Sequence, residues 1–256
     1  MKIGIIGAGL IGKTLAKKFN AAGHQVKLGD AKGAASIDTI ARSAGVSAVE
    51  MEEVTKDIEV LVVSIPLFAI PDLAKSLQGK VADDVIIVET TNYWPHRDNK
   101  IEAIDNGMVA SVWVQEQFGR PVVKTFSNIN AYSLTAEGKP KGASGRIALA
   151  VASDDQKAKE VVLGLVDDAG FDALDAGILE DSWRQQPCSP AYCTDLSLSE
   201  LAKARAMANR ETLKENQELA FGKMQHLGEE YFKILISGDY PDGFVDHAVD
   251  IAREIN

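Results

Sequence analysis

The chain has 256 residues, of which 46% are apolar and 25% are charged, and its net charge is −10. This composition is typical of a globular protein, and the length predicts one or two domains. The acidic balance argues against nucleic acid as a main partner, because phosphate backbones are bound by basic faces. The longest apolar run is short and ends at Pro66, and the N-terminus lacks a signal-peptide pattern. We therefore expect a cytoplasmic protein with no membrane partner.

Residues 2–12 combine a strand pattern with a glycine motif. An apolar run at residues 3–6 predicts a buried strand, residues 7–12 fit G-x-G-x-x-G, and residues 13–20 have a helical pattern. In this order Gly7 permits the turn, Gly9 lets the backbone approach a pyrophosphate, and Gly12 lets the helix pack closely. The alternative is a tight turn without a ligand. The predicted cofactor-binding residues of the motif are Gly7, Gly9, Leu10, Ile11 and Gly12.

An acidic residue follows the second predicted strand, which covers residues 25–29. Asp30 lies about 20 residues beyond the motif, where a dinucleotide-binding unit places the group that meets the adenosine ribose. A carboxylate there accepts a hydrogen bond from a 2′-hydroxyl and favours NAD(H). Lys32 could instead neutralise a 2′-phosphate and favour NADP(H). A solvated turn residue is the plainer interpretation of Asp30.

Residues 57–65 and 84–89 are near-continuous apolar runs, as in strands that are buried on both faces of a parallel sheet. Strand and helix patterns alternate over residues 1–90, which predicts a doubly wound α/β fold. Ligands of such folds bind at the carboxyl ends of the strands. Ordinary turn chemistry is the alternative role of the residues there. Those that we predict to bind the cofactor are Ser64, Ile65, Pro66, Thr90 and Asn92.

A short strand or extended piece is predicted at residues 46–51, and further strands are predicted at residues 121–126, 146–152 and 171–174, which gives a Rossmann sheet of about eight strands. Helices are expected at residues 36–44, 109–118 and 154–169. Residues 133–145 are expected to form a mobile loop, either a lid or a plain connection. Residues 127–132 form a polar strand end that could lie beside the nicotinamide. The predicted substrate residues are Tyr93, Trp94, Asn128, Asn130 and Trp183.

The pattern changes after residue 178, which divides the chain into a Rossmann domain (1–178) and a helical extension (179–256). Apolar residues recur at helical intervals from Leu198 to Leu235, and Gly222 and Gly228 could interrupt this helix. The extension could pack on its own domain, contribute to the cleft or form a homodimer interface. Cys188 and Cys193 are expected to be free thiols, and no metal site is expected.

The motif at residues 7–12, Ser64-Ile65-Pro66, and the residues Leu174-Asp175-Ala176-Gly177 together resemble the deazaflavin-dependent NADP reductase family. The N-terminal domain is also similar to those of flavin-linked metalloreductases and pyrroline-carboxylate reductases. The resemblance covers about residues 1–178 and implies a bacterial member with a helical C-terminal extension. Family members carry a hydroxyl residue and an arginine after the second strand to hold the 2′-phosphate, where this chain has Asp30, Ala31 and Lys32.

These patterns predict an NAD(P)H-dependent oxidoreductase. A hydride would pass between the nicotinamide and a second, small-molecule acceptor, either a flavin, a deazaflavin or a small carbonyl or imine compound. No catalytic acid or base is evident, which fits transfer between two cofactors, because orientation and exclusion of water do most of that work. The alternatives are a dinucleotide-binding sensor or regulatory module without turnover, and an assembly protein that binds no dinucleotide.

Overall fold

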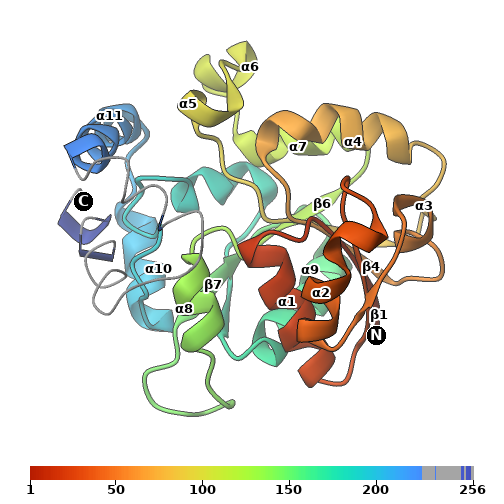
Figure 1. Cartoon of the computed structure of the whole chain (residues 1–256). Coiled ribbons are helices and arrows are strands. Elements are labelled where there is room, and N and C mark those ends of the chain that lie inside the picture. The colour runs from red at the N-terminus through yellow and green to blue at the C-terminus, as the bar shows by residue number, and fades with distance from the viewer. Residues whose placement is uncertain (227–233, 235–248, 251, 255–256) are drawn as a thin grey trace.

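The computed structural model describes residues 1–226, 234, 249–250 and 252–254. Its main sheet has six parallel strands in the order β3-β2-β1-β4-β5-β6. The strands are β1 (Lys2–Ile6), β2 (Gln25–Gly29), β3 (Ser47–Ala48), β4 (Val60–Val63), β5 (Ile86–Glu89) and β6 (Val122–Lys124). The order reverses between β1 and β4, so the predicted doubly wound fold is confirmed (Figure 1).

Two more strands, β7 (Ala148–Val151) and β8 (Asp172–Asp175), form a separate parallel pair. An antiparallel bridge between Lys124 and Ala152 joins this pair to β6, with N–O distances of 2.9 and 3.0 Å. The eight predicted strands are therefore present among the described residues, six in one sheet and two in another. The two sheets are separate because the contact between β6 and the end of β7 is a single antiparallel bridge in the described structure.

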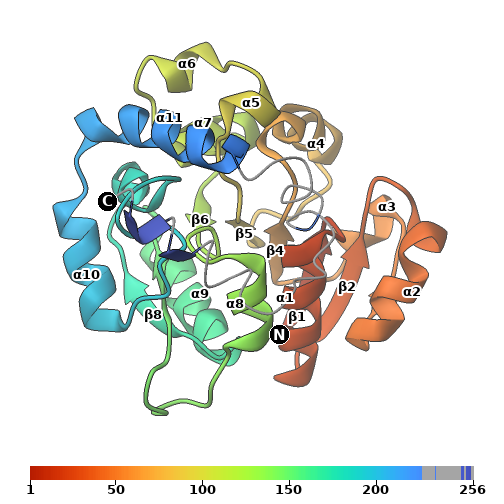
Figure 2. The same cartoon turned by 60° about the vertical axis from the view of Figure 1, so that its left-hand side comes forward.

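Helices cover both faces of the main sheet (Figures 1 and 2). One apolar cluster joins the sheet to α1 (Leu10–Ala21), α2 (Ala34–Ala44) and α9 (Gln156–Asp168). The other joins it to α3 (Met51–Val54), α4 (Ile70–Leu77) and α7 (Ala110–Phe118). Burial on both faces explains the unbroken apolar run of β4, whose four side chains are fully buried.

Short elements follow the carboxyl ends of β4, β5 and β6. They are η1 (Leu67–Ala69), α5 (Pro95–Asp98), α6 (Glu102–Asp105) and α8 (Ala131–Ala136). Helix α8 occupies the start of the segment that was expected to be a mobile loop, so that expectation is wrong for residues 133–136. The rest of the segment is held at Lys139, whose amide donates to the carbonyl of Gly170 at 2.9 Å.

The helical extension begins with η2 (Leu179–Gln185) and continues as α10 (Leu198–Met207) and α11 (Arg210–His226). The helix breaks at Ala208, whose ψ of 132° is extended, and Asn209 starts the next helix by accepting the amide of Glu211 at 3.0 Å. Gly222, one of the two glycines that could have interrupted the helix, lies inside α11, and Gly228 and Leu235 lie outside the described residues.

Small residues let α10 pack closely on the second sheet. Ala148 and Ala150 of β7 lie in one apolar cluster with Leu201 and Ala204 of α10. In Figure 2, α10 and α11 stand on the side of β8, away from α2 and α3. Within the described ranges, no helix combines the length and apolar character that a membrane crossing requires.

Candidate functional site

The turn between β1 and α1 is the centre of the candidate site. Gly7 has φ +105°, and a Cβ there would lie 2.1 Å from the carbonyl oxygen of Ser64. A Cβ on Gly12 would lie 1.9 Å from the carbonyl oxygen of Gly7. These two glycines are therefore required by the packing of the turn against β4 and α1.

Gly9 differs from its two neighbours in the motif. Its φ of −70° is open to any residue, and a Cβ added there would meet no atom of the described residues within 4 Å. It is exposed and is the N-cap of α1, and no side chain in the described part of the chain caps this helix. The first amides of a helix lack intrahelical partners, so the turn presents bare donors at the positive end of the helix dipole. Leu10 and Ile11, both half-buried, form that first turn.

Asp30 lies at the carboxyl end of β2, and its side chain ties two turns together. One carboxylate oxygen accepts the amide of Ala8 in the glycine turn at 2.9 Å, and the other accepts the amide of Lys32 at 3.0 Å. The side chain of Lys32 is exposed. The structure thus brings Asp30 to the glycine motif, as the sequence spacing predicted.

The ends of β4 and β5 lie next along the sheet. The amide of Ser64 donates to the carbonyl of Ile6, which places the Ser64–Pro66 turn beside the glycine turn. Thr90 is buried, and its hydroxyl donates to the carbonyl of Val63 at 3.4 Å. Asn92 extends the same edge and donates to the carbonyl of Ser127 at 2.9 Å, which joins the ends of β5 and β6.

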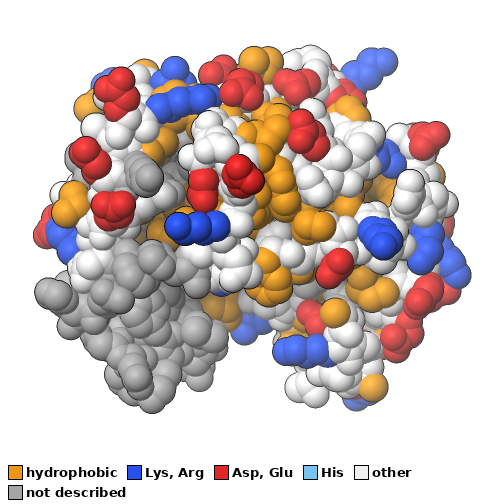
Figure 3. All heavy atoms as spheres, turned by 90° about the horizontal axis from the view of Figure 1, so that it is seen from above, with side chains coloured by type: hydrophobic (Ala, Val, Ile, Leu, Met, Phe, Trp, Pro, Cys, Tyr) orange, Lys and Arg blue, Asp and Glu red, His pale blue; other side chains and the backbone are white. Residues whose placement is uncertain are grey.

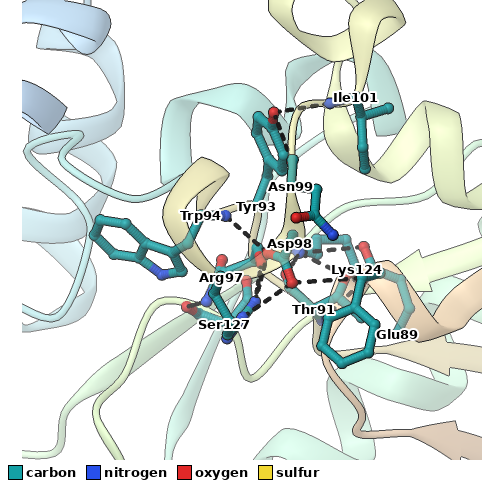
Figure 4. Close-up of polar contacts among 12 residues, drawn as sticks. Glu89, Thr91, Tyr93, Trp94, Arg97, Asp98, Asn99, Ile101, Lys124 and Ser127 are labelled. Atoms are coloured by element: carbon teal, nitrogen blue, oxygen red, sulfur yellow. Dashed lines mark hydrogen bonds and ion pairs between the residues drawn. The ribbon is translucent and has the colours of Figure 1, made fainter.

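Two predicted substrate residues use their polar atoms inside the protein. The buried Tyr93 hydroxyl accepts the amide of Ile101 at 3.1 Å (Figure 4). It also donates to Asp105 in α6 at 2.9 Å, so the ring points toward that helix. Burial raises its pKa. Asn128 is 4% exposed and is bonded at both ends of its amide, to the Ala150 amide and the Ala191 carbonyl. We assign both residues a structural role.

The other three predicted substrate residues lie in two places. Trp94 contacts the ring of Tyr192 edge-on, with centroids 6.2 Å apart, and therefore meets the segment after η2. Asn130, at the N-cap of α8, has a buried Nδ2 atom without a hydrogen-bond partner among the described residues. Trp183 lies in η2, and the guanidinium carbons of Arg184 and Arg210 lie 4.5 and 4.9 Å from the centroid of its ring.

Sequence reasoning missed a buried ion pair at the ends of β5 and β6. Lys124 is 1% exposed, and its ammonium lies 3.2 Å from Oε1 of the fully buried Glu89. The ammonium also donates to the carbonyl of Thr91, and Glu89 accepts the amide and hydroxyl of Thr91 at 2.8 and 2.6 Å (Figure 4). Burial lowers the pKa of Lys124. The signal in the sequence was an acidic residue, Glu89, at the end of one apolar strand and a basic residue, Lys124, at the end of another.

A second missed group joins the turns after β4 and β5. The carboxylate of Asp98, 2% exposed, accepts the amides of Phe68 and Trp94 at 3.4 and 2.9 Å. Arg97 pairs with it at 2.9 and 2.8 Å and also donates to the carbonyl of Asn92 at 2.6 Å. These contacts hold α5 at the candidate site.

The cysteines show no metal or disulfide chemistry. Both Cys188 and Cys193 are free, and burial raises the pKa of Cys188 to about 12. A thiol with a raised pKa is a poor nucleophile at neutral pH. The described residues contain no group of three or more His, Cys, Asp or Glu side chains that could hold a metal ion.

Three known proteins are similar to this chain in sequence or in fold. A putative protein named YjhV from Escherichia coli strain K12 is 44% identical over 71 residues, which is 28% of this chain and 52% of that protein. The chain thus spans about half the length of this curated relative. A hypothetical protein, SMa0349, from Sinorhizobium meliloti is 28% identical, with TM-score 0.67 over 77% of this chain and 95% of its own. A structure described as a putative F420-dependent NADP-reductase, from an Arthrobacter species, is 23% identical, with TM-score 0.59 over 72% and 87% of the two chains.

A family model matches the N-terminal part of the chain. Residues 2–93, which include the glycine motif, Asp30 and the Ser64–Pro66 turn, match the family described as NADP oxidoreductase, coenzyme F420-dependent. The match covers the segment on which the predicted class, a nicotinamide-dependent oxidoreductase, depends. Over residues 2–93 the chain is thus matched to the F420-dependent NADP oxidoreductases, and the resemblance predicted from its sequence is confirmed.

Proposed function

We propose that this chain binds NAD(P)(H) along the edge formed by the glycine turn, Ser64–Pro66 and Thr90–Asn92. The hydride would pass between the nicotinamide and a second acceptor, either a flavin, a deazaflavin or a small carbonyl or imine compound. The bound dinucleotide supplies the redox chemistry, and the chain binds, orients and shields the reacting groups.

The observation that supports this proposal best is the difference between Gly9 and the other two glycines of the motif. Packing explains the absence of a side chain at Gly7 and Gly12, whereas nothing in the described protein fills the space where a Cβ of Gly9 would lie. Ser, Asp or Asn at an N-cap would accept one of the first amides of the helix, whereas glycine at this N-cap leaves those amides without a side-chain acceptor among the described residues. A pyrophosphate resting against the bare main chain of Gly9 accounts for it.

Three segments that meet beyond this edge support a proposed position for the acceptor. The amide of Cys193 donates to the carbonyl of Asn128 at 3.0 Å, and Trp94 lies on Tyr192. The buried Oδ1 of Asn92 and the hydroxyl of Ser127 have no hydrogen-bond partner among the described residues, and polar groups of a ligand would satisfy them. We place the acceptor beside these loops, and we propose that the helical extension, residues 179–256, completes the cleft.

The proposal is tested by replacing Gly9 with Val, with Gly164→Val as the matched control. Gly164 lies on the exposed side of α9, and a Cβ there would also have no atom of residues 1–226 within 4 Å. Both variants should keep the wild-type thermal transition apart from a small helix-propensity effect. Gly9→Val should weaken NADH and NADPH binding at least tenfold, or about 1.4 kcal/mol, in a fluorescence titration. Equal affinity of both variants would refute the assignment of the pyrophosphate site.

Turnover separates the enzyme from a sensor. Oxidation of NADH or NADPH is followed at 340 nm with flavin mononucleotide, a deazaflavin and a cyclic imine as acceptors. Consumption with one of these and its loss in Gly9→Val supports the oxidoreductase. Tight binding of the dinucleotide without turnover across the panel would favour a regulatory module, and no binding at all would contradict both.

A further inference from the structure

The turn after β2 determines which dinucleotide the site accepts, because the adenosine ribose of a dinucleotide lies beside this turn. NAD(H) presents a 2′-hydroxyl there, which needs an acceptor. NADP(H) presents a 2′-phosphate, which needs several donors and a positive charge. The groups around residues 30–36 can therefore be compared with these two requirements.

Four hydrogen-bond donors of this turn are already used within the protein. The amides of Lys32 and Gly33 donate to Asp30, to its side chain at 3.0 Å and to its carbonyl at 2.9 Å. The amide of Ser36 donates to the carbonyl of Gly33 at 3.1 Å, and its hydroxyl donates to the carbonyl of Lys32 at 2.7 Å. A phosphate at this turn would have to displace these bonds.

A second carboxylate lies at the same turn. Glu50 comes from the segment between β3 and α3, and its Oε1 accepts the amide of Ala34, the first residue of α2, at 3.1 Å. Its Oε2 would lie 3.6 Å from a Cβ on Gly33. The amino end of a helix is the preferred place for a phosphate group. Here the protein's own carboxylate occupies that place at α2.

The charged side chains around this turn also favour a ribose hydroxyl over a 2′-phosphate. Asp30 and Glu50 contribute two negative charges around the turn, and Lys32 contributes one positive charge on an exposed side chain. Like charges at short range oppose binding, whereas a carboxylate of Asp30 is a suitable acceptor for a ribose hydroxyl. The turn is therefore complementary to a hydroxyl and unfavourable to a dianionic phosphate.

We propose that Glu50, together with Asp30, makes this chain select NAD(H) over NADP(H). The inference rests on the proposed dinucleotide site and departs from the nucleotide named in the description of the matched family. Glu50 acts by occupying the amino end of α2 and by repelling the 2′-phosphate.

The test measures the dissociation constants of NADH and NADPH by nicotinamide fluorescence for the wild type, Glu50→Gln, Asp30→Asn and the double variant. Glutamine and asparagine keep an acceptor oxygen and remove the charge. The control is Glu52→Gln, a charge removal at an exposed position in the first turn of α3. Thermal unfolding of each variant reports whether the fold is kept.

We expect the wild type to bind NADH at least tenfold more tightly than NADPH. Glu50→Gln should reduce this ratio at least threefold, through tighter NADPH binding, and should change NADH affinity by less than twofold. The double variant should bind both nucleotides about equally, and Glu52→Gln should keep the wild-type ratio. High salt should also reduce the ratio, because the repulsion is screened.

Two results would overturn this inference and leave the dinucleotide site in place. One is equal affinity of the wild type for NADH and NADPH. The other is that the ratio of the two dissociation constants is the same in Glu50→Gln as in Glu52→Gln. If the wild type bound neither nucleotide, the proposed function and the selectivity would both be refuted. The outcomes are therefore distinguishable within one set of titrations.

Discussion

Replacing Lys124 with Met should remove one half of the buried ion pair and strongly destabilise the protein. Glu89 is fully buried, and Lys124 provides its nearby positive charge at 3.2 Å. Breaking a buried pair on one side typically costs about 3–5 kcal/mol, because the remaining charge is uncompensated. Glu89 would keep its two hydrogen bonds from Thr91, so we expect the lower part of this range, about 3 kcal/mol.

The double variant Lys124→Met with Glu89→Gln removes both charges and should recover most of that loss. A buried pair replaced as a whole by neutral groups is often nearly neutral in stability. The free energy of unfolding is measured by urea denaturation at neutral pH, with coincident fluorescence and circular-dichroism transitions as the test of two-state behaviour. The double-mutant cycle should give a coupling energy of about 2 kcal/mol.

The pH dependence provides an independent check. Burial lowers the pKa of Lys124 in the folded protein below its unfolded value of 10.5. Between the two values the unfolded chain binds more protons at this group, so its contribution makes the unfolding free energy rise with pH. This rise should be present in the wild type and missing in Lys124→Met. A destabilisation by Lys124→Met of less than about 1 kcal/mol would refute the claim that Lys124 and Glu89 are coupled by burial. The same holds if the double variant changes the unfolding free energy by the sum of the two single-variant changes.

Three further predictions concern single residues. Asp30→Asn should improve NADPH affinity at least threefold, measured by fluorescence titration, and a change under twofold would mean that the carboxylate does not face the ribose. Tyr93→Phe should lower the unfolding free energy by about 1–2 kcal/mol, because the hydroxyl bonds to Asp105 are lost, and should leave turnover unchanged. Asp167→Asn should be less stable than the wild type at pH 7 by about 1 kcal/mol. The Lys141 ammonium and the Arg146 guanidinium lower the pKa of Asp167 in the folded protein below its ordinary value of 3.8. The difference in unfolding free energy between wild type and Asp167→Asn, measured by urea denaturation, should therefore decrease as the pH falls below 3.8 and be lost once the pH is below the folded pKa.

The glycine motif and its acidic partner could be predicted because the information is local. The strand, the three glycines and the following helix are contiguous, so the motif can be recognised without knowledge of distant residues. The distance from Gly12 to Asp30 is likewise fixed by one helix and one strand. The structure accordingly places Asp30 against the glycine turn.

The direction of the loop side chains could not be predicted. Tyr93 and Asn128 follow their strands at positions where ligands bind, but their polar groups pair with α6 and with β7, which arrive from elsewhere in the chain. The pairing of Glu89 with Lys124 likewise depends on β5 and β6 being neighbours. Glu50 reaches α2 only because β3 lies beside β2.

The break in the C-terminal helix has the same origin. The apolar spacing from Leu198 onward is continuous, so periodicity alone predicts one helix through Ala208. The structure ends α10 there because its apolar side is matched to the short strands β7 and β8. Asn209 then supplies the acceptor with which α11 starts in a new direction.

Lys124 connects three parts of the molecule through different atoms. Its main chain forms the bridge to Ala152, by which the second sheet and the helix α10 packed on it are attached to β6. Its ammonium holds the carbonyl of Thr91 in the turn after β5. A displacement of the C-terminal helices is therefore mechanically linked to that turn through a single residue, and hydrogen exchange at Ala152 and Thr91 should report the two ends of this linkage together.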